Sequence, residues 1–444
     1  MPPSLEEWLP EGHLARFLSD VIGELDLGEI YASYEEDARG MAAYHPQMMT
    51  KLLFYGYCVG KASSRKLEQA TYEDVAVRYL SANQHPDHDT IAEFRCRHLP
   101  ALARLFVQVL RLCGSAGLVK LQHVAIDGTK MRANASRYKS ANYERLEGEQ
   151  RQLEQKMAEW LGHCEEVDQA EDGQYGKGCR GDELPPELRD GQKRLAKIRE
   201  LQQQLEEEAR QAAEKKKAEV EKHLAERQAE EERRGRRLGG RPPRVPDVNA
   251  AKPKPTAQRN RTDPESRIMK DGATNSFQQS YNAQVAADGA AQIIVAAHVT
   301  QAEHDREQLL PNVREVEENL GHKPQRVSAD CGYYDPDHLE SDYLNDIELY
   351  VPPVPEPRAG AKASRWARNG PLLERLRAQA RRPEAQAVYR LRQGIVEPIF
   401  GQIKQCRGFR QFLLRGLQKV NAEWQIICAT HNVLKLYRFR AANR

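Results

Sequence analysis

The chain has 444 residues, more than an average domain, so we expect about two or three structural units. Its eight cysteines are scattered without a CxxC pair, which argues against a disulfide framework and a thiolate zinc site. No apolar run approaches the roughly 20 residues of a membrane span, and no secretory signal is recognisable, so we expect a soluble intracellular protein without a membrane partner. The net charge is +2, yet residues 358–444 carry 19 Lys and Arg against 4 Asp and Glu. This imbalance predicts a C-terminal region that binds a polyanion, usually nucleic acid.

The N-terminal part, residues 1–120, is predicted to form an all-helical domain. Between residues 46 and 119 the apolar side chains recur at three- and four-residue steps. Thr90 and Glu93 have capping-box spacing, which predicts a helix start near Asp89. Such a bundle is either a helix-turn-helix DNA reader or a packed appendage, and the residues alone support both readings.

A short β-like segment in residues 121–142 precedes an abrupt change in composition. Residues 143–261 are rich in Glu, Lys, Arg, Gln and Ala, and end in a linker rich in Pro and basic residues. A heptad-like track predicts either an intramolecular helical hairpin or a modest coiled coil, with these residues on the packed side: Leu195, Ile198, Gln202, Leu205, Ala209 and Ala212. A glycine-rich turn over residues 169–186 is expected between the two arms.

Residues 262–444 have the pattern of an α/β domain. Two β-runs meet at a hairpin signal over residues 287–290, and an amphipathic helix follows that Gly321 is placed to end. A strand before Asp330, a short helix, a strand near residues 348–354 and basic C-terminal helices complete the order. We therefore predict a mixed sheet with helices on its faces, interrupted after its first strand by the charged insertion.

Three acids end or follow apolar runs instead of lying on charged faces: Asp127 closes VAID, Asp330 closes RVSAD and Glu397 follows GIV. A buried carboxylate must be paired, hydrogen-bonded or metal-bound, and Mg²⁺ prefers oxygen ligands of this kind. Each acid alone has an ordinary explanation as a turn or cap residue, as Asp335 and Asp337 do. Their combination in one sheet domain beside a basic helix favours catalysis.

Five ordered blocks resemble the DDE transposases of bacterial insertion sequences, in the branch with a Tyr-Arg-Glu-Lys helix signature. The segments HPQMMTKLLFYGYCVGKASSRKLEQ and PDHDTIAEFRCRH resemble its N-terminal helical domain. AIDGTKMRANAS is similar to the block of the first aspartate, and TDPESRIMK with SYNAQVAADG to the approach to the second. SADCGYYD resembles the second-aspartate block, and YRLRQGIVEPIFGQIKQCRGFRQFLLRG resembles the glutamate block.

The resemblance implies a ribonuclease H-like catalytic domain that cleaves and joins DNA strands at the ends of its own element. It implies Asp127, Asp330 and Glu397 as ligands of two Mg²⁺ ions, with Mn²⁺ as an alternative ion. The other signature members would be Tyr389, Arg392 and Lys404, and with them the expected DNA contacts are Arg390, Arg407 and Arg410. The expected partners are double-stranded DNA, both terminal inverted repeats and target DNA, and a second copy of the chain in a dimer. The expected location is the bacterial cytoplasm, at the nucleoid.

Two other functions stay open at this point. One is a related nuclease that cuts without joining. The other is a catalytically silent DNA-binding relic or regulator of a mobile element. The intact acids argue against decay of the site but do not prove activity.

The glutamate block departs from the signature in one respect. Four residues separate Arg392 from Glu397 where the branch has three, so on a regular helix Arg390 lies nearer the glutamate's face. Pro398 either starts the helix with Glu397 as its cap or kinks a longer helix, and we favour the kink. The isoleucines at 395, 399 and 403 are predicted to pack on the sheet, with Glu397 and Lys404 on another face.

Overall fold

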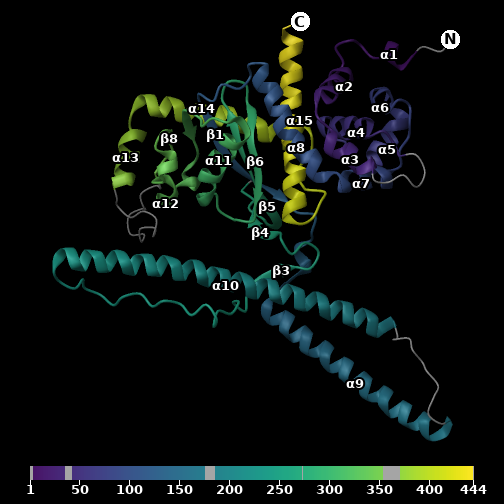
Figure 1. Ribbon diagram of the computed structural model, residues 1–444, viewed down its shortest axis with the longest axis vertical. Helices are drawn as coiled ribbons and strands as arrows, with labels where there is room; N and C mark the ends of the chain where they lie inside the picture. The colour runs from purple at the N-terminus through teal and green to yellow at the C-terminus, as the bar shows by residue number, and fades with distance from the viewer. Residues whose placement is uncertain (1–3, 36–42, 176–185, 273, 354–370, 444) are drawn as a thin grey trace. The chain divides into compact units, whose positions relative to one another are not determined.

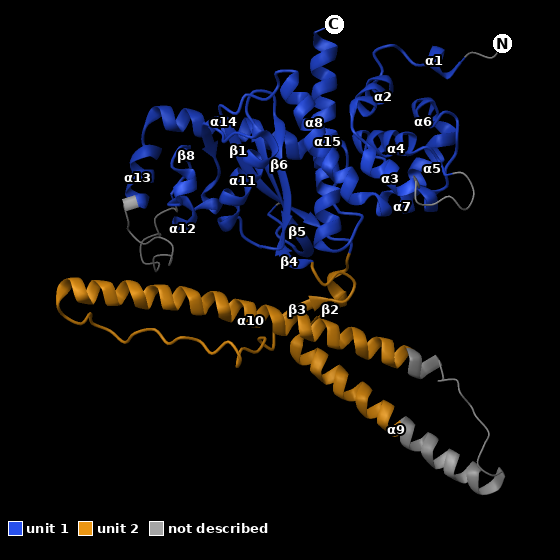
Figure 2. Cartoon of the chain, in the orientation of Figure 1, with its two compact units in different colours: residues 1–134, 266–444 blue, residues 135–265 orange. Residues whose placement is uncertain are grey.

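The computed structural model describes residues 4–35, 43–175, 186–272, 274–353 and 371–443 (Figure 1). Two compact units divide the chain (Figure 2): residues 1–134 with 266–444, and residues 135–265. Among the described helices, none has the length and apolar character needed to cross a bilayer.

The first unit begins with a series of helices, as the sequence predicts. Asp87 caps α7 by accepting a hydrogen bond from the backbone of Thr90 at 2.6 Å, so this helix begins at His88, next to the predicted start. The helices are α1 (Leu5–Trp8), α2 (Leu14–Glu24), α3 (Gly28–Glu35), α4 (Pro46–Cys58), α5 (Ser64–Glu73), α6 (Val75–Leu80), α7 (His88–Arg97) and α8 (Leu99–Ser115).

A mixed sheet forms the centre of this unit, in the order β4-β5-β1-β7-β8, with β6 also paired to β5. Strand β1 is antiparallel to β5 and parallel to β7, and β7 is parallel to β8. The predicted hairpin is present between β5 and β6, whose last partners are Asp288 and Ile293. The strands are β1 (Val124–Arg132), β4 (Arg267–Lys270), β5 (Phe277–Asp288), β6 (Ile293–Thr300), β7 (Arg326–Ser328) and β8 (Glu348–Tyr350).

Helices and short helical turns accompany the sheet, which confirms the predicted mixed α and β class. Gly321 ends α11 with φ +76°, a left-handed conformation that glycine adopts without strain. These elements are η2 (Arg306–Gln308), α11 (Leu309–Leu320), η3 (Cys331–Tyr333), α12 (Pro336–Leu339), η4 (Asp342–Leu344), α13 (Pro371–Ala380), α14 (Pro383–Gly401), the π-helical turn η5 (Gln402–Cys406) and α15 (Leu417–Ala442).

Helix α15 joins the N-terminal helices to the sheet. It packs against α8, α4 and β6 (Figure 1). Trp424 donates from its indole nitrogen to the Gln284 carbonyl, and Asn432 bonds both backbone groups of Ile294. The N-terminal helices therefore share a compact unit with the sheet, whereas the sequence predicted a separate domain over residues 1–120.

The second unit contains the charged segment. Strands β2 (Ser140–Asn142) and β3 (Gln258–Asn260) form its base, next to the short turn η1 (Arg137–Lys139), and carry the long helices α9 (Tyr143–Tyr175) and α10 (Pro186–Arg234). Most of the predicted glycine-rich turn, residues 176–185, lies outside the described residues. The core of the unit consists of Ala141, Leu146, Ile198, Leu201 and Leu205.

Candidate active site

Two of the three predicted acids lie near each other on neighbouring parallel segments: Asp127 is within β1, and Asp330 follows the end of β7 by two residues. Val124 and Ala125 of β1 are in register with Val327 and Ser328 of β7. Asp127 lies two positions after Ala125, and Asp330 lies two positions after its partner Ser328. The two aspartates are therefore at the same level along the two neighbouring segments. Each carboxylate also accepts a hydrogen bond from the backbone nitrogen of a nearby glycine. Gly128 donates to Asp127 and Gly332 donates to Asp330, both at 2.8 Å.

The environment of Asp127 favours its protonated form. Burial raises the pKa of this carboxyl, the Arg392 guanidinium lowers it and the nearby charge of Asp330 raises it, with a net value of about 6. Asp330 therefore lies close enough to Asp127 for its charge to act on this carboxyl.

Arg392 is the cation that meets this pair. Its Nη1 atom donates to Oδ2 of Asp127 at 3.0 Å, and its side chain is only 9% exposed. Tyr389, one turn earlier on α14, lies with its ring 5.5 Å from the guanidinium. Arg390 is exposed, so of the two arginines considered from the sequence it is Arg392 that reaches the acids.

Glu397 does not join Asp127 and Asp330. Helix α14 extends from Pro383 to Gly401 with Pro398 inside it, so Pro398 does not start the helix. Glu397 is exposed, and its carboxylate bonds none of the described residues. Five positions along a helix rotate a side chain by about 140°. With Arg392 turned inward, Glu397 consequently turns outward. The predicted apolar stripe is confirmed, because Ile395, Ile399 and Ile403 are buried.

Three basic residues after α14 were predicted to bind DNA, namely Lys404, Arg407 and Arg410, and their environments differ. Lys404 is half-buried and donates from Nζ to the Thr129 hydroxyl and, at 2.9 Å, to the Lys130 carbonyl, which ties η5 to β1. Arg410 is exposed, and its Nε donates to the Lys404 carbonyl at 3.3 Å.

Arg407 is buried, whereas the sequence predicted it on the DNA-binding surface. It is 6% exposed and donates from Nη1 to the Thr430 hydroxyl at 2.8 Å and to the Ile427 carbonyl at 3.2 Å. Burial lowers the pKa of its guanidinium to about 10. Arg407 thus holds η5 against α15, and we remove it from the predicted DNA contacts.

Two family models match the chain at its ends. Residues 3–97 match the family described as Transposase domain (DUF772), and residues 362–437 match the family described as Transposase DDE domain. These two matches support a DDE transposase of an insertion sequence. No curated protein and no solved structure matches it significantly.

The DDE match indicates a phosphoryl-transfer enzyme that acts on DNA, as predicted. It includes Glu397 of α14 and Lys404 of η5, while Asp127 and Asp330 lie outside it. For these two acids the support comes from the strand register and from the charge of Asp330, which raises the pKa of Asp127.

A divalent cation fits this transposase site in part. The neighbouring carboxylates of Asp127 and Asp330 supply oxygen ligands of the kind that Mg²⁺ prefers, and a bound cation would compensate the buried charge of Asp127. Across the described ranges, however, no group of three or more His, Cys, Asp or Glu side chains is arranged to hold an ion. The predicted three-acid set is incomplete in this arrangement because Glu397 faces outward.

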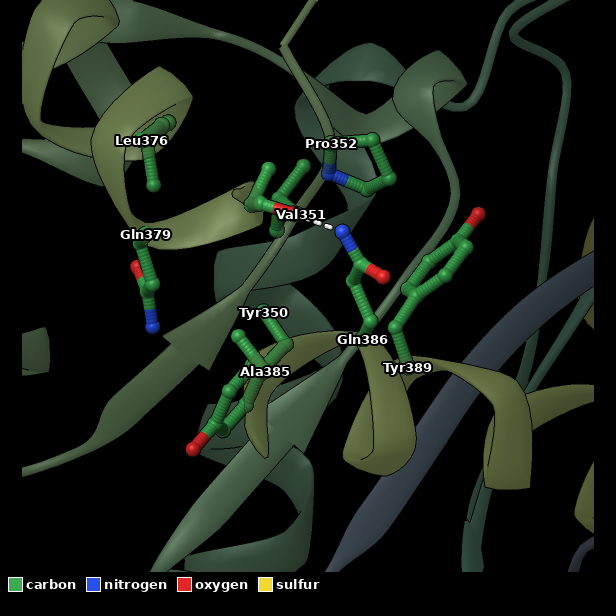
Figure 3. A pocket seen from close by; sticks show the side chains of 9 residues that line it. Tyr350, Val351, Pro352, Leu376, Gln379, Ala385, Gln386 and Tyr389 are labelled. Atoms are coloured by element: carbon green, nitrogen blue, oxygen red, sulfur yellow. Dashed lines mark hydrogen bonds between the residues drawn. The ribbon is translucent and has the colours of Figure 1, made fainter. Parts of the chain in front are cut away.

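A small apolar pocket lies beside the site, between β8, α13 and α14 (Figure 3). Its volume is about 130 Å³, and Val351, Leu376 and Ala385 line it together with Tyr350 and Tyr389. Tyr389 therefore contacts both this pocket and the Arg392 guanidinium. Tyr389 was predicted from the sequence as a signature residue and a DNA contact, but nothing in the pattern of residues predicted the pocket.

Sequence reasoning also missed a set of buried polar side chains behind the two acids. Asn282 and Gln284 of β5 are fully buried, Tyr333 follows Asp330, and Asp305 precedes η2. The available signal was the pair of polar residues at alternate positions in an otherwise apolar strand. Buried amides require partners, so this pattern indicated a polar contact at the sheet.

Proposed function

We propose that this transposase cleaves and joins DNA strands at the ends of an insertion sequence, using a ribonuclease H-like domain and divalent metal ions. The observation that carries the proposal is the level placement of Asp127 within β1 and Asp330 just after the adjacent parallel strand β7. We also assign the chain to the Tyr-Arg-Glu-Lys branch, with Tyr389, Arg392, Glu397 and Lys404 as its signature residues.

The two aspartates would hold the cation, with Mg²⁺ or Mn²⁺ as its identity. Such an ion, when bound, polarises the phosphoryl group and lowers the pKa of water. The chain's own part is positioning: Gly128 and Gly332 fix one oxygen of each acid, and Lys404 fixes η5 on β1. Arg392 keeps Asp127 charge-compensated in the free protein.

DNA binding is assigned to the exposed basic residues of the C-terminal region. Arg390 and Arg410 are exposed, and Tyr389 lies half-buried at the edge of the site. Phosphate contacts release counterions, so binding should weaken steeply with salt. We place the protein in the bacterial cytoplasm at the nucleoid, acting as a dimer on terminal repeats and target DNA.

The charged insertion is assigned to assembly of that dimer. Its helices α9 and α10 extend well beyond the small core they share. Deleting residues 145–238 should reduce the mass measured by light scattering on the DNA complex from dimer to monomer. An unchanged oligomeric state would exclude this role.

One observation favours the silent DNA-binding alternative: Glu397 is exposed and Arg392 bonds the carboxylate of Asp127. The two functions are separated by incubating the purified protein with its own flanking DNA and Mg²⁺, scoring cut and joined products. Both products support the transposase, cutting without joining identifies a nuclease, and binding alone identifies the relic.

A further inference from the structure

A connected set of buried polar side chains lies behind the two aspartates. Asp305 accepts hydrogen bonds at its Oδ1 atom from Asn282 at 2.6 Å and from Gln284 at 2.7 Å. The Gln284 amide nitrogen also donates to Oδ1 of Asn282 at 3.0 Å, and its oxygen accepts from the Tyr333 hydroxyl. The set therefore runs without a break from Asp305 through Gln284 to Tyr333.

At one end of this network, the side chains of Gln284 and Asp305 pack against the backbone of Gly128, next to Asp127. Gly128 is registered opposite Gln284, so the two residues share a face of the sheet. A Cβ atom on Gly128 would lie 2.3 Å from the Gln284 amide nitrogen and 2.7 Å from Oδ1 of Asp305. Only glycine leaves room for the network here. The Gly128 backbone nitrogen in turn donates to Asp127 at 2.8 Å, so the network sets the position of a group that holds this acid.

The other end anchors the segment that holds Asp330. Tyr333 is fully buried and ends η3, the turn in which Gly332 donates to Asp330. The backbone nitrogen of Tyr333 also donates to the Asp330 carbonyl at 3.2 Å. Burial, followed by the charges of Asp305, Asp127 and Asp330, raises the pKa of Tyr333, so its hydroxyl stays protonated and remains a donor.

The network also carries its own charge compensation. Lys130, in register with Asn282, has its Nζ atom 3.6 Å from Oδ1 of Asp305. The partly exposed carboxylate of Asp305 is thus contacted by two amides and an ammonium group.

We propose that Asp305, Gln284 and Tyr333 are positioning residues that fix the separation of Asp127 and Asp330, and thereby set how tightly the pair holds a divalent cation. The inference rests on the proposed function, because it assumes that these two acids bind the ion. It adds residues that the three-acid scheme does not contain. Groups that orient metal ligands commonly change metal affinity by about 10- to 100-fold when removed.

The test compares two neighbouring tyrosines. Tyr333→Phe removes the hydroxyl that reaches Gln284, whereas Tyr334→Phe removes a hydroxyl from the next residue, which is also buried, and leaves the network intact. Mn²⁺ binding is measured by calorimetry on the full chain without DNA, together with melting temperature and the metal dependence of cleavage. We expect Tyr333→Phe to weaken Mn²⁺ binding about tenfold and excess metal to restore its cleavage. Tyr334→Phe should match the parent.

A second pair of variants, both at Asp305, distinguishes the positioning role of this residue from an effect of its charge. Asp305→Asn keeps an oxygen for the two amides and should retain most of the Mn²⁺ affinity, while Asp305→Ala should lose at least as much as Tyr333→Phe. Parent-like Mn²⁺ affinity in Tyr333→Phe, with or without a lower melting temperature, would overturn the inference while leaving the proposed function standing. A parent protein that neither binds Mn²⁺ nor cleaves DNA would refute the proposed function, and the inference with it.

Discussion

The Nη1 atom of Arg392 donates to Oδ2 of Asp127 at 3.0 Å, joining residues that are 265 positions apart in the sequence. This bond ties α14 to the strand that carries the first acid. The Arg392 guanidinium already compensates the charge of Asp127, so a metal ion that binds Asp127 must share this carboxylate with Arg392 or displace Arg392 from it. The pair therefore links the charge state of the site to the position of α14.

Removing this cation should make Asp127 harder to ionise. Because the Arg392 guanidinium lowers the pKa of Asp127, Arg392→Gln should move the titration midpoint of that carboxyl to higher pH, above its present value of about 6. Carbon-13 NMR of labelled aspartate in metal-free buffer measures the shift. Arg390→Gln, an exposed neighbour on the same helix, serves as the control and should leave the midpoint in place. An unchanged midpoint in Arg392→Gln would show that Arg392 does not lower the pKa of Asp127.

Asp127→Asn should change the pH dependence of stability. The folded-state pKa of Asp127 is raised from 3.8 to about 6, so in the parent the unfolded chain loses this proton first as pH rises. Parental stability should therefore fall between about pH 4 and 6, by roughly 2–3 kcal/mol from this group, and the asparagine variant lacks that loss.

Thermal unfolding in chelator at pH 4 and pH 7.5 measures this effect. The stability of Asp127→Asn relative to the parent should increase between the two values. A difference that is the same at both pH values would contradict the raised pKa.

Arg407 and Arg410, three residues apart, should behave in opposite ways. Arg407→Gln loses buried bonds to α15 and should destabilise the fold by about 2 kcal/mol or more. Arg410→Gln changes an exposed side chain and should leave the melting temperature unchanged, while the slope of log affinity against log salt falls by about 1. Melting curves and DNA titrations at several salt concentrations distinguish them. The reverse pattern would restore Arg407 to the DNA-binding surface.

Glu397 is the acid for which sequence and structure differ most. Since its carboxylate is exposed, Glu397→Gln should alter stability by less than about 0.5 kcal/mol. If α14 rearranges on DNA to bring Glu397 to the metal, the same variant should still abolish cleavage. Glu384→Gln, another exposed glutamate on α14, is the matched control. Cleavage by Glu397→Gln at the parental rate would exclude this residue from the site.

Local patterns in the sequence predicted much of the fold. Helical periodicity predicted the N-terminal helices, and the apolar runs before Asp127 and Asp330 predicted the two neighbouring strands β1 and β7. The Gly321 cap and the hairpin before Ile293 were also predictable from local chemistry.

Features that depend on packing between distant segments were not predictable. The burial of Arg407 depends on α15, and the outward direction of Glu397 depends on which face of α14 meets the sheet. Helix α15 itself has buried residues on several sides, from Val420 to Leu436, and so joins two regions that composition alone separates.

The most direct test of the account is strand cleavage by Asp127→Asn and Asp330→Asn on the protein's own terminal DNA in Mg²⁺. Asp337→Asn is the control, because this aspartate lies exposed at the start of α12, seven residues after Asp330. The account predicts that both site variants bind the DNA but neither cut nor join it, while Asp337→Asn gives both products at the parental rate. Parental cleavage by either site variant would contradict the assignment of the Asp127 and Asp330 pair as the catalytic centre.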